Sequence, residues 1–182
     1  MSNNKTYEFS LNLAKIPNFD IHTNIETINI SKEYLDNYAR YLKKIISDLD
    51  KNSITSLTVF GGEPFLHFNK IKSFIESLID DIDFFTIITY GNNILENWND
   101  ILNLWHKLSN RFTIKFEWNE NHSNSFWYCF NKVMRRKLTT GINARISGNN
   151  VTYLPELITN FSKNVYIVDS FEAGSGNGDA AN

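Results

Sequence analysis

A turn of four residues, Gly61-Gly62-Glu63-Pro64, has residue types that could do chemistry. It lies between a short apolar run and a segment with helical spacing of apolar residues. Gly61 and Gly62 permit backbone angles that other residues avoid, and they let a ligand approach the main chain closely. Glu63 offers a carboxylate that could take an ammonium group, and Pro64 suits the start of a helix. The same residues equally fit a tight connection in which the carboxylate meets the positive end of a helix dipole.

Other polar residues lie at the end of one strand-like segment or alternate with apolar residues within another. Arg145 and Ser147 close a short strand-like segment, and we expect them to point toward the same mouth as the turn. Lys115 and Glu117 lie two apart, so they share one face of a strand. They either face the interior as a buried pair or mark a less-covered strand, and the second interpretation is preferred. Cys129 lies in an aromatic run and is interpreted as a core thiol on a helix.

Strand-like and helix-like segments alternate along the whole chain. The predicted strands are Tyr7–Leu13, Ile54–Phe60, Phe84–Tyr90, Phe112–Trp118, Gly141–Ile146 and Val165–Val168. The predicted helices are 34–46, with Ser31 as N-cap, Phe68–Ile79, Ile94–Leu108, Phe126–Leu138 and Val151–Phe161. This alternation predicts a mostly parallel α/β sheet with right-handed crossovers. The glycine-containing turn follows the second strand, at the carboxyl ends where such sheets form ligand sites.

The composition indicates one globular domain. The 182 residues include 42% hydrophobic and 14% aromatic side chains, and the net charge is −2 with a pI near 6.1. There is no basic excess to suggest nucleic acid or an anionic membrane as a partner. The N-terminus lacks a secretory pattern and no apolar run is long enough to span a bilayer, so we expect a cytoplasmic protein. We predict a domain over residues 1–170 and a flexible Gly/Ala/Asn-rich tail over residues 171–182.

The turn and its surroundings resemble radical S-adenosylmethionine (SAM) enzymes, especially the branch that matures peptides. Members of that family carry Gly-Gly-Glu-Pro at this place, followed by an apolar pair, a polar residue and a helix similar to NKIKSFIESL. The stretch FTIITYGNNI is similar to the family's third strand, which usually ends Thr-Asn-Gly-Thr. FNKVMRRKLTTGINARISGNNVTYLPELITNFSKN resembles its fourth helix, fifth strand and fifth helix. The resemblance covers about residues 7–170. It implies a partial (β/α)6 TIM-like barrel whose turn contacts the amino group of SAM.

The loop after the first strand departs from the family. There the family has three cysteines that hold a four-iron, four-sulfur cluster, and SAM binds the open iron. The corresponding stretch here reads LNLAKIPNFDIHTN, and the cysteine positions fall on Pro17, Ile21 and Asn24. Those side chains do not replace thiolates, and the single Cys129 cannot hold a cluster. We therefore predict no iron–sulfur cluster and do not expect SAM binding.

These observations predict a non-catalytic, radical-SAM-like pseudoenzyme. It would act as a binding or scaffolding subunit in the modification of a ribosomally made peptide, with the precursor peptide or a modification enzyme as partner. Gly61, Gly62, Glu63 and Pro64 would then be a vestigial SAM turn, with Arg145 and Ser147 as weaker members of the site. Two alternatives stay open. One is a cluster-independent enzyme that uses Glu63, Glu117, Lys115 and Arg145 at the barrel mouth, and the other is a fragment of a split or truncated maturase.

Overall fold

The fold is a six-stranded sheet in which every neighbouring pair of strands is parallel. The computed structural model describes residues 5–14, 29–118, 124–146, 152, 155 and 167–173. The strands follow chain order and are β1 Thr6–Asn12, β2 Ile54–Phe60, β3 Phe84–Thr89, β4 Phe112–Trp118, β5 Thr139–Ile146 and β6 Ile167–Ala173. The helices are α1 Lys32–Ser47, α2 Phe68–Ser77, α3 Trp98–Leu108 and α4 Asn124–Arg135, with short 3₁₀ turns η1 Pro64–His67 and η2 Ser109–Arg111. The predicted α/β partial TIM-like barrel is confirmed.

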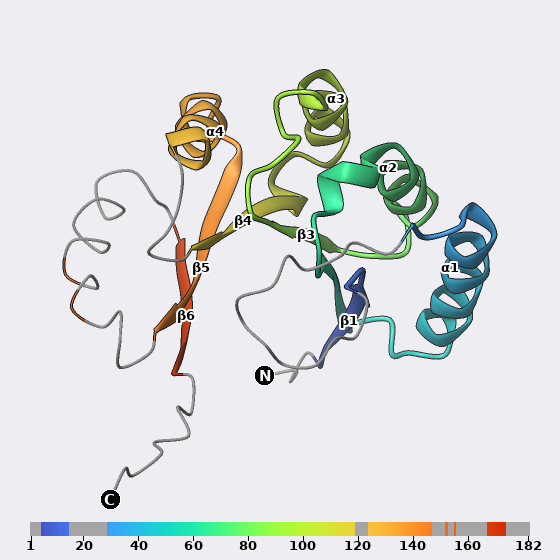
Figure 1. Cartoon of the computed structure of the whole chain (residues 1–182). Helices are drawn as coiled ribbons and strands as arrows, with labels where there is room; N and C mark the ends of the chain where they lie inside the picture. The colour runs from blue at the N-terminus through green and yellow to red at the C-terminus, as the bar shows by residue number, and fades with distance from the viewer. Residues whose placement is uncertain are drawn as a thin grey trace, which may run out of the picture.

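The four described helices lie along the outer side of a curved sheet (Figure 1). The alternation within β2 shows why the sheet has two different faces. Leu57 and Val59 are buried, whereas Thr58 between them is half-buried on the opposite, concave face. The side chains of β2 alternate in burial because the helices cover one face of the sheet.

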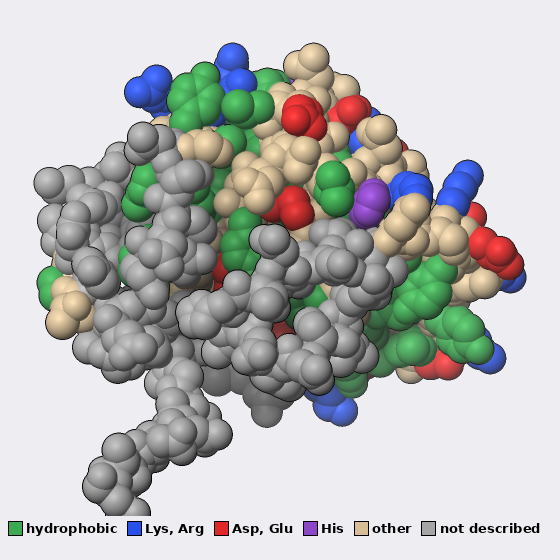
Figure 2. Space-filling model, viewed as in Figure 1, with side chains coloured by type: hydrophobic (Ala, Val, Ile, Leu, Met, Phe, Trp, Pro, Cys, Tyr) green, Lys and Arg blue, Asp and Glu red, His purple; other side chains and the backbone are tan. Residues whose placement is uncertain are grey.

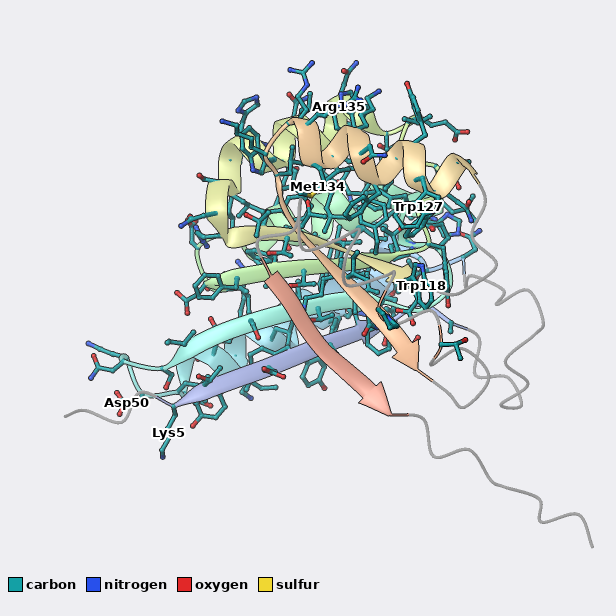
Figure 3. All side chains as sticks on the ribbon, turned by 90° about the vertical axis from the view of Figure 1, so that its left-hand side faces the viewer. Lys5, Asp50, Trp118, Trp127, Met134 and Arg135 are labelled. Atoms are coloured by element: carbon teal, nitrogen blue, oxygen red, sulfur yellow. The ribbon has the colours of Figure 1, made fainter. Side chains whose placement is uncertain are left out.

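Aromatic contacts hold α4 against the sheet. The ring of Phe116 on β4 meets the rings of Phe126 and Phe130 edge-on, with centroids 5.5 and 5.3 Å apart. Such edge-to-face pairs add to the stabilisation that comes from burying the rings. Figure 3 shows Met134 on the side of α4 that faces the sheet and Arg135 on its outer side.

Two of the predicted boundaries differ from the structure by about four residues or more. The third helix begins at Trp98 rather than Ile94, because the preceding residues form turns in which the Asn97 side chain donates to the carbonyl oxygens of Phe65 and Asn93. The last strand begins at Ile167 and runs to Ala173, three residues into the segment predicted to be the tail. Backbone pairing with β5 produces that extension, since composition alone does not reveal a ladder of hydrogen bonds.

The remaining predictions for the first and last helices have different outcomes. Ser31 is the N-cap of α1, and its hydroxyl accepts a hydrogen bond from the Tyr34 amide at 3.1 Å, as predicted. The helix predicted at Val151–Phe161 lies outside the described residues, apart from Thr152 and Pro155. Residues 174–182 also lie outside the described part of the chain. Among the helices that are described, none has the length and apolar character needed to cross a membrane.

The Arg111 side chain connects the start of β4 to the segment between α2 and β3. Its guanidinium donates to the carbonyl oxygens of Ile79 at 2.6 Å, Ile82 at 2.5 Å and Asp83 at 2.9 Å. The planar fork of arginine suits such a divergent set of acceptors, which the single ammonium of lysine reaches less well.

We expect Arg111→Lys to lower the free energy of unfolding by about 2 kcal/mol, because hydrogen bonds from a charged donor are each worth roughly 1.5–3 kcal/mol. Urea unfolding followed by circular dichroism measures the change. Arg136→Lys is the matched control, because Arg136 is exposed and its replacement should change the free energy by no more than about 0.5 kcal/mol. Equal effects of the two substitutions would contradict this role for Arg111.

Candidate functional site

The Gly-Gly-Glu-Pro turn leaves the carboxyl end of β2 with two residues in the left-handed region. Gly61 has φ +84° and Gly62 has φ +56°, so both adopt the backbone angles that glycine was predicted to permit here. A Cβ atom on Gly61 would lie 2.0 Å from Asn12 Oδ1 and 2.8 Å from the Ala14 amide nitrogen. The close approach that glycine permits here is therefore made by the chain itself.

The segment that packs on Gly61 is the end of β1. The Leu13 amide donates to the Phe60 carbonyl at 2.7 Å and so extends the β1–β2 ladder. The Asn12 side chain accepts from the Ala14 amide at 2.8 Å. Asn12 thus closes a local turn, and its Oδ1 occupies the space beside Gly61.

The Glu63 carboxylate joins the β2 turn to the end of β3. It is the N-cap of η1, and its Oε1 accepts from the Phe65 amide at 3.0 Å. The Thr89 hydroxyl lies 2.8 and 2.9 Å from the two carboxylate oxygens, and the Tyr90 amide donates to Oε2 at 3.2 Å. The Asn92 backbone also donates to this carboxylate. Both oxygens therefore accept hydrogen bonds from neighbouring parts of the fold.

Burial dominates the electrostatics of Glu63. The residue is 8% exposed, and desolvation raises the pKa of its carboxyl group from 4.5 to about 7. The hydrogen bonds from Phe65, Thr89, Tyr90 and Asn92 act in the opposite direction and favour the ionised form. Glu63 is therefore an acid that titrates near neutral pH inside a set of hydrogen-bond donors.

Pro64 begins η1 and is buried, which confirms the prediction that it starts a helical turn. The turn is a short 3₁₀ helix that leads directly into α2 at Phe68. Proline suits this position because its missing N–H would have no partner in the first turn of a helix.

Glu117 faces the concave side of the sheet and is 9% exposed. Its Oε2 accepts from the side-chain amide of Asn143 at 2.7 Å, and these two residues are paired in register between β4 and β5. Lys115, half-buried on the same face, is in register with Gly141. β4 is a central strand, so the preferred interpretation of a less-covered strand is wrong and Glu117 faces the interior.

The structure does not place the other two predicted site residues against the turn. Arg145 is in β5, paired in register with Glu172, but its side chain lies outside the described residues, as does Ser147. Sequence reasoning missed Asn143. Its position two residues before Arg145, on the same face of a strand, was the available signal.

A row of hydroxyl groups crosses the concave face and was also missed. Its members occupy matched register positions on five successive strands: Ser10, Thr58, Thr86, Thr113 and Thr139. Ser10 is exposed and the four threonines are half-buried. Each strand shows a serine or threonine in the sequence, but only the register places them side by side. We call these five residues the hydroxyl row.

Cys129 is on α4, 3% exposed and not in a disulfide, which confirms the predicted core thiol. Desolvation raises the pKa of its thiol, the nearby Lys132 acts in the opposite direction, and Glu63 raises it further. A buried thiol with a raised pKa is largely protonated at neutral pH and is a poor nucleophile and metal ligand.

Gly61→Ala and Gly91→Ala form a matched pair, because both glycines have positive φ. Each substitution strains the backbone, but the nearest atom to an added Cβ at Gly91 is 3.5 Å away, whereas at Gly61 it is 2.0 Å away. We expect Gly61→Ala to lower the free energy of unfolding by about 1–3 kcal/mol more than Gly91→Ala. Chemical denaturation measures both, and equal losses would show that the contact with Asn12 yields easily.

Glu63→Gln tests the titration of the buried carboxylate. Folding raises the pKa of the Glu63 carboxyl group. Between pH 4.5 and about 7, the folded state therefore keeps a proton that the unfolded state has lost. The contribution to stability is fully present below pH 4.5 and is lost as the pH rises through 7, by about 3 kcal/mol in all. The free energy of unfolding of the wild type, relative to Glu63→Gln, should therefore fall over this range.

Unfolding curves at several pH values between 4.5 and 8 provide the measurement. Glu8→Gln, at an exposed position on β1, shows how much of the change comes from net charge. If the free energy of unfolding of the wild type instead rises with pH relative to that of Glu63→Gln, the hydrogen bonds outweigh burial at this site.

One protein family matches the sequence over residues 23–123, and it is described as a 4Fe-4S single cluster domain. The match covers more than half of the chain and includes α1, the Gly-Gly-Glu-Pro turn and β4. It begins after Pro17 and Ile21, two of the three positions where the resemblance would place cysteines. No curated protein matches the sequence. The chain belongs to this family of radical SAM-type 4Fe-4S single cluster domains.

Proposed function

We propose that this protein is a radical SAM-type domain that works without an iron–sulfur cluster, as a binding or scaffolding subunit in the modification of a ribosomally made peptide. Its partner would be the precursor peptide or the enzyme that modifies it. The observation that carries the proposal is the donor set: the chain belongs to a cluster-binding family and contains one cysteine.

The residues present do not fit a four-iron, four-sulfur cluster. Such clusters are held by cysteine thiolates, and the family's loop supplies three of them. The positions that the resemblance assigns to those thiolates hold Pro17, Ile21 and Asn24, which lie outside the described residues but carry no sulfur in any conformation. Cys129 is buried on α4. Within the described ranges, no three His, Cys, Asp or Glu side chains form a group that could hold a metal ion.

The contacts of the turn support loss of SAM binding. In the family the turn contacts the amino group of SAM. Here the Glu63 carboxylate accepts from Phe65, Thr89, Tyr90 and Asn92, and these hydrogen bonds help to hold the β2–β3 junction together. We infer that the turn has been retained because the fold requires it.

The concave face is the surface that best suits a peptide. An extended polar peptide can exchange hydrogen bonds with the hydroxyl row, and Glu117 with Asn143 lies beyond that row on the carboxyl side of the sheet. β1 is the end strand of the sheet, and its outer edge suits strand addition less well. The Tyr38 hydroxyl donates to the Ser10 carbonyl at 2.9 Å, so a side chain of the protein already occupies that part of the edge.

The first test is the iron content after anaerobic reconstitution with iron and sulfide. We expect iron far below one cluster per chain and no brown absorption, and no heat of SAM binding by calorimetry for the wild type or Glu63→Ala. A stoichiometric chromophore would overturn the proposal. If Cys129→Ser removed a weak chromophore, that signal would be adventitious iron on the one thiol.

The second test is binding to the products of neighbouring genes, with the full chain immobilised and each candidate precursor peptide or enzyme in solution. We expect at least one to bind, and Thr113→Arg on the hydroxyl row to weaken peptide binding about tenfold or more, equivalent to about 1.4 kcal/mol. Ser73→Arg, exposed on α2, is the control and should leave binding unchanged. If none binds, the scaffolding proposal fails. If a bound partner supplies a cluster and the pair is active, the chain is half of a split maturase.

A further inference from the structure

We propose that α1 is a dimerisation surface, on which a second copy of this chain packs its own α1 in the antiparallel direction. The surface is the stripe formed by Tyr34, Tyr38, Tyr41 and Ile45, and we call it the α1 stripe. The inference concerns assembly of the chain with itself and is independent of the proposed function.

The α1 stripe exposes large apolar side chains at the spacing of a helix–helix seam. Tyr34 is 53% exposed, Tyr41 70% and Ile45 46%. Successive members of the stripe are four, three and four residues apart, which is the heptad spacing that keeps side chains on one seam between two packed helices. Scattered exposed hydrophobic residues need no explanation, but a stripe at this spacing indicates a contact surface.

The centre of the stripe is held in place by the fold. The Tyr38 hydroxyl is bound to the Ser10 carbonyl on β1, and its ring stacks on Phe74 of α2 with centroids 5.9 Å apart. The Tyr34 ring stacks on Tyr38 in turn, at 6.3 Å. Because these rings are already ordered, pairing would lose less side-chain entropy than it would with freely rotating residues.

Apart from the Tyr38 ring, which packs on Phe74 of α2, the stripe lies on the flank of α1 away from α2. The side of α1 toward α2 carries Asp36, which lines a groove with Asn69 and Ser73 of α2, and Lys43, which pairs with Asp81 at 3.1 Å. With 3.6 residues per turn, the α1 stripe lies on the opposite flank from Asp36 and Lys43. α1 is at the end of the arc of described helices in Figure 1, and Figure 2 shows hydrophobic side chains gathered over it.

Charges beside the stripe favour a second copy in the antiparallel direction. Glu33 and Lys44 lie on the outer flank of α1, with the acid in its first turn and the base in its last turn. Antiparallel pairing places Glu33 of each copy near Lys44 of the other. Parallel pairing would place Glu33 against Glu33 and Lys44 against Lys44, which is repulsive.

A two-fold axis that passes between Tyr38 and Tyr41 brings the stripes of the two copies together and also places their opposite charges near each other. It places Tyr34 opposite Ile45 of the second copy, and Tyr38 opposite Tyr41 of the second copy. The same patch then serves on both chains, as a two-fold interface requires.

The first test is the mass of the purified full chain by sedimentation velocity over a range of concentrations. We expect a concentration-dependent dimer, and Tyr41→Glu or Ile45→Glu should shift the protein to monomer, since each buries a carboxylate in the seam. Tyr128→Glu is the matched control, because Tyr128 is 61% exposed on α4 and its replacement should leave the dimer intact. Circular dichroism checks that each variant is folded. If one of the two stripe variants does not fold, the other still tests the proposal.

The second test distinguishes the direction of pairing. Glu33→Lys and Lys44→Glu alone should each weaken the dimer, and the two together should restore it, because the exchanged charges again lie opposite one another. A monomeric wild type at every concentration overturns the proposal, as does a dimer that Tyr128→Glu disrupts and Tyr41→Glu does not. Failure of the double variant to recover overturns the antiparallel arrangement. Thr113→Arg should leave the dimer unchanged, so this result and the peptide-binding result are read separately.

Discussion

A buried carboxylate must be satisfied by the groups around it, and the junction between the second and third strands of this protein is organised around that requirement. Glu63 is 8% exposed, and its oxygens accept from the backbone or side chains of η1, the end of β3 and the turn that follows. Leaving such a group without partners would cost several kcal/mol, so the positions of η1 and of the end of β3 depend on each other. Asn97 adds a further connection, because its side chain donates to the Phe65 carbonyl.

This dependence gives the turn a structural reason to be present in a chain that contains a single cysteine. Gly61 admits the end of β1, Glu63 holds β3, and Pro64 begins the 3₁₀ turn into α2. Gly61, Glu63 and Pro64 therefore have structural roles that do not require SAM. Retention of the motif is consequently weak evidence for the chemistry of the family, whereas the cysteine content is strong evidence, because one thiolate does not hold a four-iron, four-sulfur cluster.

The sheet ends at β1 and the layer of described helices ends at α1, and the surfaces at these two ends differ. The edge of β1 is protected at Ser10 by the Tyr38 hydroxyl, which reduces the tendency of an unpaired strand to add another chain. The flank of α1 next to that edge keeps large apolar side chains in solvent. The concave face, in contrast, carries the hydroxyl row across five strands, and it is the surface that we propose for an extended peptide.

The amino-acid sequence by itself determined the order of strands and helices, the parallel α/β class, the Ser31 N-cap, the buried state of Cys129 and the presence of a single cysteine. These follow from local periodicity, capping chemistry and residue identity, which need no knowledge of distant contacts. Tertiary structure decided the rest. The hydrogen-bond partners of Glu63, the Glu117–Asn143 contact and the hydroxyl row all join residues about 26 or more positions apart, except within the turn itself. Strand register and burial set those contacts, and a change of register by one residue would move every one of these side chains to the other face.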